Sequence, residues 1–305
     1  MRRLIALAGF ALTMALSQPA LACGDHVPRT AIVSAFEPEW TALKNLTHQK
    51  RECRIGGVGF VTGTLGQHRV VLFLSGVSMV NAAMTTQSAL DHFHIKRLIF
   101  TGIAGATDTT LAIGDVAVPE AWATYLEANF ARETPDGFRP FRFTPGPYPP
   151  NFGMIHPQGV HVTAPGAPLE TKLWFPVDPE LLRLAGQAAA QVKLSRCAAS
   201  GQCLDHPPKI VVGGKGVSAS IFLDNAKFRD YLASAFSARV ADMESSALAQ
   251  TAYANGVPFI VFRSVSDLAG GGEGENQMRA FMALAAEHAA QVTLGLLVLL
   301  PRHET

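Results

Sequence analysis

The stretch "VPFIVFRSVSD" (257–267) constrains the fold of this chain more than any other. It is an almost unbroken apolar run, rich in valine and phenylalanine, that ends on the carboxylate of Asp267. Such a run predicts a strand that is buried on both faces, as in parallel sheets covered by helices. The small-residue stretch before it, "ADMESSALAQTAYANG" (241–256), ends on Gly256 and predicts a helix with its stop signal. A helix that leads directly into a buried strand is typical of an α/β protein.

The rest of the chain repeats this alternation. Further strands are expected over 29–36, 59–76 (two strands around Gly66-Gln67), 97–106, 114–123 and 209–223. Further helices are expected over 37–46, 79–93, 178–192, 225–236 and 275–300. The helix at 178–192 has Asp178 as its N-cap and Pro179 at its first position. The predicted fold class is therefore α/β, a single domain with a central mixed sheet flanked by helices. Residues 131–176, dense in proline, glycine and aromatic residues, predict a long insertion in this domain.

Composition limits the function classes. The chain has 305 residues, 48% of them hydrophobic, which suffices for one large domain with a substantial core, or at most for two small domains. Its formal net charge of +1 gives no electrostatic reason to expect a nucleic-acid or anionic-membrane partner. The apolar end of the last helix, "LGLLVLL", is too short to span a bilayer and is expected to pack on the sheet.

The first 22 residues predict export. Two arginines, an apolar stretch and the sequence Ala20-Leu21-Ala22 have the three-part pattern of a secretory signal peptide, which leaves 23–305 as the mature domain. Cleavage after Ala22 makes Cys23 the first mature residue. A lipoprotein signal also places cysteine first, but it normally has leucine three residues earlier, where this chain has Ala20. The expected location is therefore periplasmic or secreted, with a lipid anchor as the less favoured alternative.

Four cysteines in an exported chain predict two disulfides. Cys197 and Cys203 flank a tight loop that can close on itself, which leaves Cys23 to pair with Cys53. No histidine or cysteine pair has the spacing of a zinc site, so no metal is expected.

Lone carboxylates stand at the edges of the predicted core. In α/β sheets, ligands bind where the carboxyl ends of strands meet the loops that lead to the helices. Glu37 and Glu39 follow the first strand, Asp267 ends the last one, and the triplet 242–244 is expected to open a helix. Each acid alone has an ordinary structural explanation, but together they favour a pocket. Glycine turns are expected at the same strand ends, at Gly76, Gly102–Gly105 and Gly213–Gly216. These turns lack the G-x-G-x-x-G pattern of a dinucleotide site, and no G-x-S-x-G elbow of a serine hydrolase is present.

Several motifs carry a family resemblance. In order and spacing, "SAFEPEW", "SGVSMVNAA", "TGIAGATDTTLAIGDVAVP" and "VADMESSALAQTAYANGVPFIVFRSVSD" resemble the nucleoside phosphorylase/hydrolase superfamily, and within it the 5′-methylthioadenosine/S-adenosylhomocysteine nucleosidases. "SIFLDNAKFRDYL" and "LWFPVD" also resemble the related plant vegetative and bark storage proteins. The resemblance covers about 30–300 apart from the insertion.

The resemblance implies roles for individual residues. Glu39 matches the acid that activates the attacking water, Glu244 the acid that holds both ribose hydroxyls, and Asp267 the acid that protonates N7 of the departing purine, with Ser266 beside it. Arg263 matches a residue that helps to organise the water site. Ile221 and Phe222 are alternatives for the aromatic position that stacks on the base. Ile103 stands where these nucleosidases often have serine. The remaining implied substrate-binding residues are Val77, Ala104, Gly105 and Met243.

Three functions follow from these features. The first is a hydrolase of purine nucleosides that needs no cofactor and, by resemblance, assembles as a homo-oligomer. The second is a phosphorylase. The anionic first turn disfavours this function, because the Glu39 carboxylate repels phosphate. The third is a non-catalytic binding or storage protein, which has no need for all three of the matched acids.

Overall fold

The computed structural model describes residues 23–141, 146–198 and 201–301. The predicted signal peptide, 1–22, lies outside these residues. The helices are α1 (Glu37–Leu46), α2 (Met79–His92), α3 (Pro179–Ala189), α4 (Ala226–Phe236), α5 (Ser245–Asn255) and α6 (Met278–Leu299). The strands of the main sheet are β1 (Asp25–Ser34), β2 (His48–Ile55), β3 (Val58–Leu65), β4 (His68–Leu74), β5 (Phe93–Ala106), β6 (Val116–Val118), β7 (Ala121–Thr124), β14 (Phe175–Pro176), β15 (Ile210–Val212), β16 (Lys215–Ser218), β17 (Ala238–Asp242) and β18 (Phe259–Asp267).

These strands form one mixed sheet, so the predicted α/β fold class is confirmed. Its order within the described residues is β14-β7-β16-β17-β5-β1-β4-β3-β2, with β18 beside β5 and β6, and β15 beside β6. The strands β1, β5 and β18 run parallel to one another, whereas β17 is antiparallel to the end of β5. Their pairing brings Ser34, Gly105, Asp242 and Asp267 to one region of the sheet.

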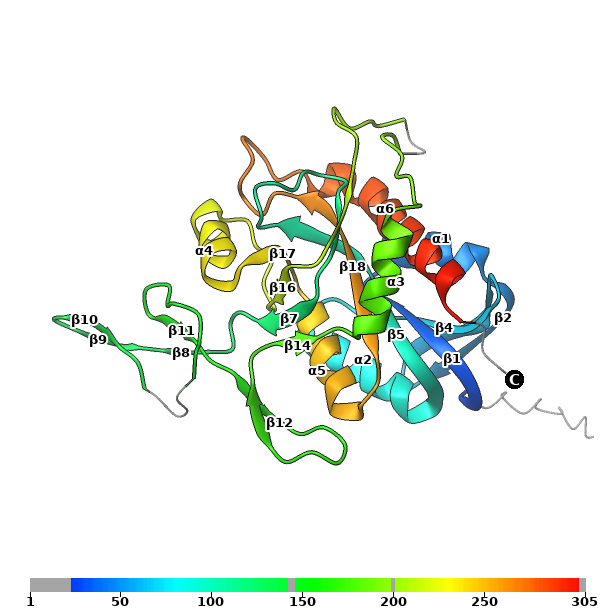
Figure 1. Cartoon of the computed structure of the whole chain (residues 1–305), viewed down its shortest axis with the longest axis horizontal. Coiled ribbons are helices and arrows are strands. Elements are labelled where there is room, and N and C mark those ends of the chain that lie inside the picture. The colour runs from blue at the N-terminus through cyan, green and yellow to red at the C-terminus, as the bar shows by residue number, and fades with distance from the viewer. Residues whose placement is uncertain (1–22, 142–145, 199–200, 302–305) are drawn as a thin grey trace, which may run out of the picture.

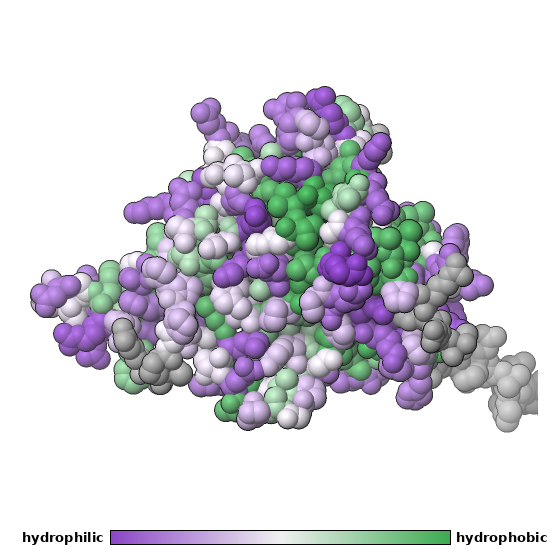
Figure 2. All heavy atoms as spheres, in the orientation of Figure 1, coloured by the Kyte–Doolittle hydropathy of each residue, from purple (hydrophilic) through white to green (hydrophobic). Residues whose placement is uncertain are grey.

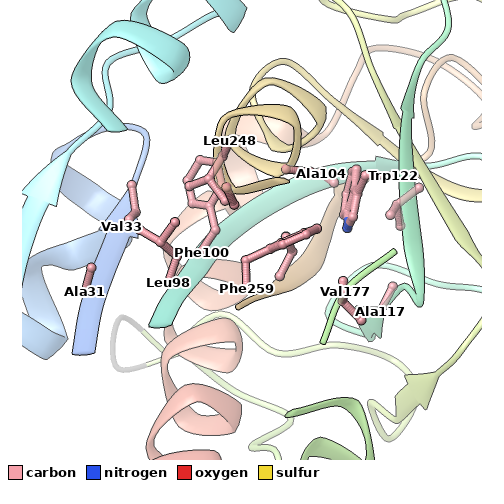
Figure 3. Close-up of a cluster of buried hydrophobic side chains, with 14 of the residues drawn as sticks. Ala31, Val33, Leu98, Phe100, Ala104, Ala117, Trp122, Val177, Leu248 and Phe259 are labelled. Atoms are coloured by element: carbon pink, nitrogen blue, oxygen red, sulfur yellow. The ribbon is translucent and has the colours of Figure 1, made fainter. Parts of the chain in front are cut away.

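Helices cover both faces of the sheet (Figure 1). One face packs against α2 and α5, where Phe100, Phe259 and Leu248 belong to a single buried cluster (Figure 3). The other face packs against α1, α3 and the second half of α6, with Trp40 and Leu296 among the buried residues. Because the central strands are covered on both faces, the nine residues of β18 are all buried, as the apolar run predicts.

The last helix, α6, is strongly apolar and packs into the core. Among the described residues, only α6 is long and apolar enough to cross a membrane, but 56% of its apolar window is buried inside the protein. Its buried positions include Leu284, which belongs to the cluster with Phe100, and Val292 and Leu296, which belong to the cluster with Trp40. The exposed side chains over α3 and α6 include a hydrophobic strip in an otherwise largely hydrophilic face (Figure 2). The helix is a core element, as expected for its apolar end.

The described parts of 131–176, together with β8 just before them, form short paired strands. The pairs are β8 (Ala128–Phe130) with β11 (Ile155–Pro157), β9 (Arg132–Thr134) with β10 (Gly137–Arg139), and β12 (Val160–Val162) with β13 (Glu170–Lys172). The first two pairs project from the body beyond α4 (Figure 1). The third is tied to α5, because the Tyr253 hydroxyl donates to Glu170 and Lys172 lies over the Tyr253 ring.

Several predicted element bounds are wrong. The predicted helix at 241–256 begins only at Ser245, because Ala238–Asp242 forms β17. The predicted strand at 114–123 is two strands, β6 and β7, separated at Pro119, which has no N–H for a ladder. The charged strand β2 was not predicted; its side chains are mostly exposed, so it lacks an apolar pattern. By contrast, the Asp178 carboxylate accepts a hydrogen bond from Leu181 N (2.9 Å), which confirms its N-cap role.

Both predicted disulfides are present, Cys23–Cys53 and Cys197–Cys203. The first joins the start of β1 to β2, and the second closes the loop that follows α3. No free cysteine remains among the described residues.

The two disulfides are expected to stabilise the fold unequally. Replacing Cys23 and Cys53 together by serine should lower the free energy of unfolding by about 3–4 kcal/mol, because the bond spans a sequence separation of 30. Replacing Cys197 and Cys203, which are separated by 6, should cost about 1 kcal/mol less, because the closed loop is shorter. Urea unfolding of the two double variants beside the wild type measures this difference, and the reverse order would contradict it.

Candidate active site

A cavity of about 340 Å³ lies where β1, β5, β17 and β18 end. It is lined by Ala35, Phe36, Glu39, Val77, Ile103, Ala104, Gly105, Ile221, Phe222, Leu223, Ala241, Asp242, Met243, Glu244, Ser266, Asp267, Met278 and Met282. The structure therefore brings every predicted catalytic and substrate-binding residue except Arg263 to one cavity. The described part of 131–176 contributes nothing to the lining. The glycine turn 213–216 also lies elsewhere, because it joins β15 to β16 at the opposite end of β16 from Ser218; the expectation that it ends at the pocket is wrong.

Arg263 lies beneath the cavity and is fully buried. Its guanidinium is 2.7 Å from Asp242 Oδ2, 3.6 Å from Glu39 Oε1 and 3.7 Å from Glu244 Oε2. Burial lowers the pKa of Arg263, but the three carboxylates outweigh it and raise the pKa above its ordinary value. One cation thus holds three acids from three different segments.

Glu39 is held at both oxygens. Oε2 accepts from Ala35 N (2.6 Å) and Oε1 from Ile103 N (2.8 Å). The helix α1 begins directly after β1, so its first turn brings this carboxylate back over the strand ends. Burial raises the pKa of Glu39, and Arg263 opposes this in part. A buried carboxylate with a raised pKa suits a general base near neutral pH.

The approach of Glu39 to Arg263 depends on Gly102. A Cβ atom added at Gly102 would collide with both the Arg263 guanidinium and the Glu39 carboxylate. The position is therefore restricted to glycine by the charges above it, although its φ lies in the ordinary range.

Glu244 lies at the N-terminus of α5. Its Oε1 accepts from Ser78 N (2.8 Å), at a turn where Ser78 has a φ of 83°. Burial raises the pKa of Glu244 to about 7, against the stabilising charge of Arg263 and with the repulsion of Asp242.

Asp267 is buried at the end of β18. Its Oδ2 accepts from Ser266 Oγ (2.9 Å), and its Oδ1 accepts from Ala269 N (2.9 Å). Gly105 faces it closely, because a Cβ added there would lie 3.0 Å from Oδ1. These contacts hold the carboxylate at both of its oxygens.

Sequence reasoning assigned no role to Asp242. This carboxylate accepts from the Ser245 hydroxyl, from Ser218 Oγ (2.5 Å) and from the N–H groups of Glu244 and Ser245 (3.2 and 3.1 Å), besides pairing with Arg263. Asp242 therefore anchors the start of α5 and helps to fix the position of Glu244. The acidic triplet 242–244 is visible in the sequence, but on its own it predicts a helix start and not an ion pair with Arg263.

The remaining lining is apolar. Phe36, Met278 and Met282 were not predicted, and the two methionines come from the first turns of α6, one helical turn apart. Ile221 and Phe222 both line the cavity, and their side chains are 40% and 52% exposed, so both stand at its opening.

An α/β fold with three acids from separate strand ends around one cavity defines a site for a small molecule. The residues 29–298 match the Phosphorylase superfamily, and the chain belongs to this family. The resemblance expected from the sequence motifs is thereby confirmed.

Two kinds of named protein are similar to this chain. The chain is 31% identical over 266 residues to the 5′-methylthioadenosine/S-adenosylhomocysteine nucleosidase of Staphylococcus aureus, covering 87% of this chain and 97% of that protein. It is 31% identical over 221 residues to bark storage protein B of Populus deltoides, covering 71% and 70%. Among solved structures, S-adenosylhomocysteine nucleosidase from Streptococcus pyogenes in complex with 5-methylthiotubericidin has a TM-score of 0.66 at 25% identity, covering 90% of this chain and 98% of that one.

The raised pKa of Glu244 predicts a pH dependence of stability. The pKa of Glu244 is about 7 in the folded protein and 4.5 ordinarily. Between pH 4.5 and pH 7, the folded protein therefore binds a proton at Glu244 more tightly than the unfolded chain does. Its contribution to the free energy of unfolding therefore falls as pH rises from about 4.5 to about 7. Wild type should lose stability relative to Glu244→Gln across this interval.

Urea unfolding at a series of pH values measures the difference between the two proteins. Glu133→Gln, which alters an exposed acid on β9, is the control and should track wild type. A constant difference between Glu244→Gln and wild type would contradict the prediction.

Proposed function

We propose that this protein is an N-ribosyl hydrolase that cleaves a purine nucleoside of the 5′-methylthioadenosine or S-adenosylhomocysteine kind. One observation carries the proposal: Glu39, Glu244 and Asp267 surround a single cavity of about 340 Å³. These are the three positions to which the sequence resemblance assigns water activation, ribose binding and base protonation. The 31% identity to a nucleosidase over nearly its whole length supports the same activity.

The reaction assigns one step to each acid. Asp267 donates a proton to N7 of the purine as the C1′–N9 bond breaks, and the bonding electron pair goes to the base. Water adds to C1′ and gives its proton to Glu39. The products are the free purine and the sugar, and the two acids recover their starting protonation by exchange with solvent. This is the division of labour between acid and base that inverting glycosidases use.

Glu244 binds the ribose. Its Oε1 is already held by Ser78 N, which leaves lone pairs on both oxygens for the two sugar hydroxyls. Hydrogen bonds to an ionised carboxylate are stronger than neutral ones, about 1.5–3 kcal/mol each. Met243, its neighbour in the chain, also lines the cavity.

Hydrolysis is favoured over phosphorolysis by charge. Among the described residues that line the cavity, the charged side chains are the carboxylates of Glu39, Asp242, Glu244 and Asp267. Arg263 has no exposed surface and already pairs with three of them. A phosphate ion entering this cavity would meet negative charge without a free cation, whereas water would meet none of that repulsion.

Location and assembly are part of the proposal. Two disulfides in the described chain support the exported location that the first 22 residues predict, in the periplasm or outside the cell. We infer a homo-oligomer from the resemblance. A storage role is the second candidate, because bark storage protein B is a similar relative, but the presence of all three acids at one cavity favours catalysis.

A substrate screen tests the function. The protein is incubated with a panel of purine nucleosides that differ in the 5′ substituent, with and without inorganic phosphate, and the free base is measured. Release of adenine from methylthioadenosine without phosphate supports hydrolysis. A requirement for phosphate would instead indicate a phosphorylase, and binding without release would favour the storage role.

The separate roles of the acids predict different dependence on the leaving group. Asp267→Asn should lower turnover of adenine nucleosides by about 10²–10⁴-fold, the usual range for a lost general acid. It should retain much of the activity on 4-nitrophenyl riboside, whose leaving group needs no protonation. Glu39→Gln should lose activity on both substrates, because water attacks in each case. An equal loss on both for Asp267→Asn would mean that Asp267 only supports the pocket.

A further inference from the structure

Asn276 lies in the glycine-rich loop between β18 and α6 and contacts the proposed acid. Its Nδ2 donates to Asp267 Oδ1 (3.4 Å) and to Asp224 Oδ1 (2.9 Å). Its Oδ1 accepts from Met278 N (2.9 Å) at the start of α6. The surroundings fix the orientation of the amide, because the reverse orientation would turn its oxygen toward two carboxylates and its NH₂ toward an N–H donor.

The same loop is joined to the segment 219–225 at further points. Asn225 N donates to Ala269 O (3.2 Å), and Gly270, with a φ of 86°, lies against the backbone of Asp224 and Asn225 with no space for a Cβ atom. The loop before α6 therefore lies beside the start of α4 (Figure 1). The joined segment carries Ile221 and Phe222 into the cavity opening.

The two oxygens of Asp267 have different surroundings. Oδ1 accepts from Ala269 N and from Asn276 Nδ2, whereas the single donor within reach of Oδ2, among the described residues, is Ser266 Oγ. Oδ1 is thus occupied by two donors, and Oδ2 keeps a lone-pair direction for a proton. The hydrogen bond from Asn276 Nδ2 therefore adds to the one from Ala269 N in holding Oδ1.

We propose that Asn276 is a positioning residue for base protonation, which rests on the hydrolase function proposed above. It fixes the rotation of the Asp267 carboxylate so that Oδ2 delivers the proton. Through Asp224 it also keeps the segment that carries Ile221 and Phe222 at a set distance from that carboxylate. The purine base would then lie between Ile221 and Phe222 on one side and Asp267 on the other. The Asn276 side chain links these two sides of the base site.

Two substitutions separate this role from capping of α6. Asn276→Asp keeps an oxygen for Met278 N but loses the NH₂ donor, whereas Asn276→Ala loses both. Each should lower kcat on methylthioadenosine by about 10–100-fold, the range for a lost hydrogen bond to a charged group. Neither should lower kcat on 4-nitrophenyl riboside to that extent, because that reaction does not use the proton. Gln277→Ala, an exposed neighbour in the same loop, is the matched control and should behave as wild type.

The outcomes distinguish the proposal from a structural role. Equal losses on both substrates would mean that Asn276 only maintains the pocket, and wild-type kcat for Asn276→Asp would assign the effect to the helix cap. Either result overturns the proposal while leaving the hydrolase function intact.

Adenine binding measured by calorimetry gives a readout that does not depend on turnover. Wild type and Gln277→Ala should bind adenine alike, and both Asn276 variants should bind it more weakly. Unchanged binding in the variants would count against the proposal. A wild type that neither binds adenine nor releases it from nucleosides would overturn the hydrolase function and this inference together.

Discussion

The pairing of one buried guanidinium with three carboxylates is the interaction on which the site depends. Arg263 is fully buried, and Asp242, Glu39 and Glu244 reach it from β17, α1 and the start of α5. Removing one partner of a buried ion pair typically costs about 3–5 kcal/mol, because the other charge is left without compensation. Here the loss of Arg263 would leave three such charges. The positions of the two acids proposed for water activation and ribose binding are therefore inseparable from the stability of the core beneath them.

The sequence predicted those elements whose signal is local. The two strands around Gly66-Gln67 and the helix capped by Asp178 both follow from short-range turn and capping chemistry, and both are present. The strand β2 was missed because its side chains are largely exposed and charged. The strand β17 was missed because "ARVAD" runs directly into a helix, and its strand conformation comes from pairing with β5 and β16.

The site was predictable to the extent that its residues lie at strand ends or in the family motifs. Glu39, Glu244 and Asp267 meet these conditions. Met278, Met282 and Asn276 do not, because they reach the cavity or its acid through the path of the loop before α6, which no local pattern determines. Asp242 was visible as an acid, but its function as a partner of Arg263 depends on a contact across 21 positions of the chain that only the fold creates.

The space above Gly102 has a consequence for comparing sequences across this superfamily. The volume that a side chain would need is already filled by the Glu39 carboxylate and the Arg263 guanidinium. A chain of this fold with a larger residue there has lost or displaced one of the two charged groups. The residue at this one position can therefore separate relatives that keep the Glu39–Arg263 arrangement from relatives that have changed it, without any assay.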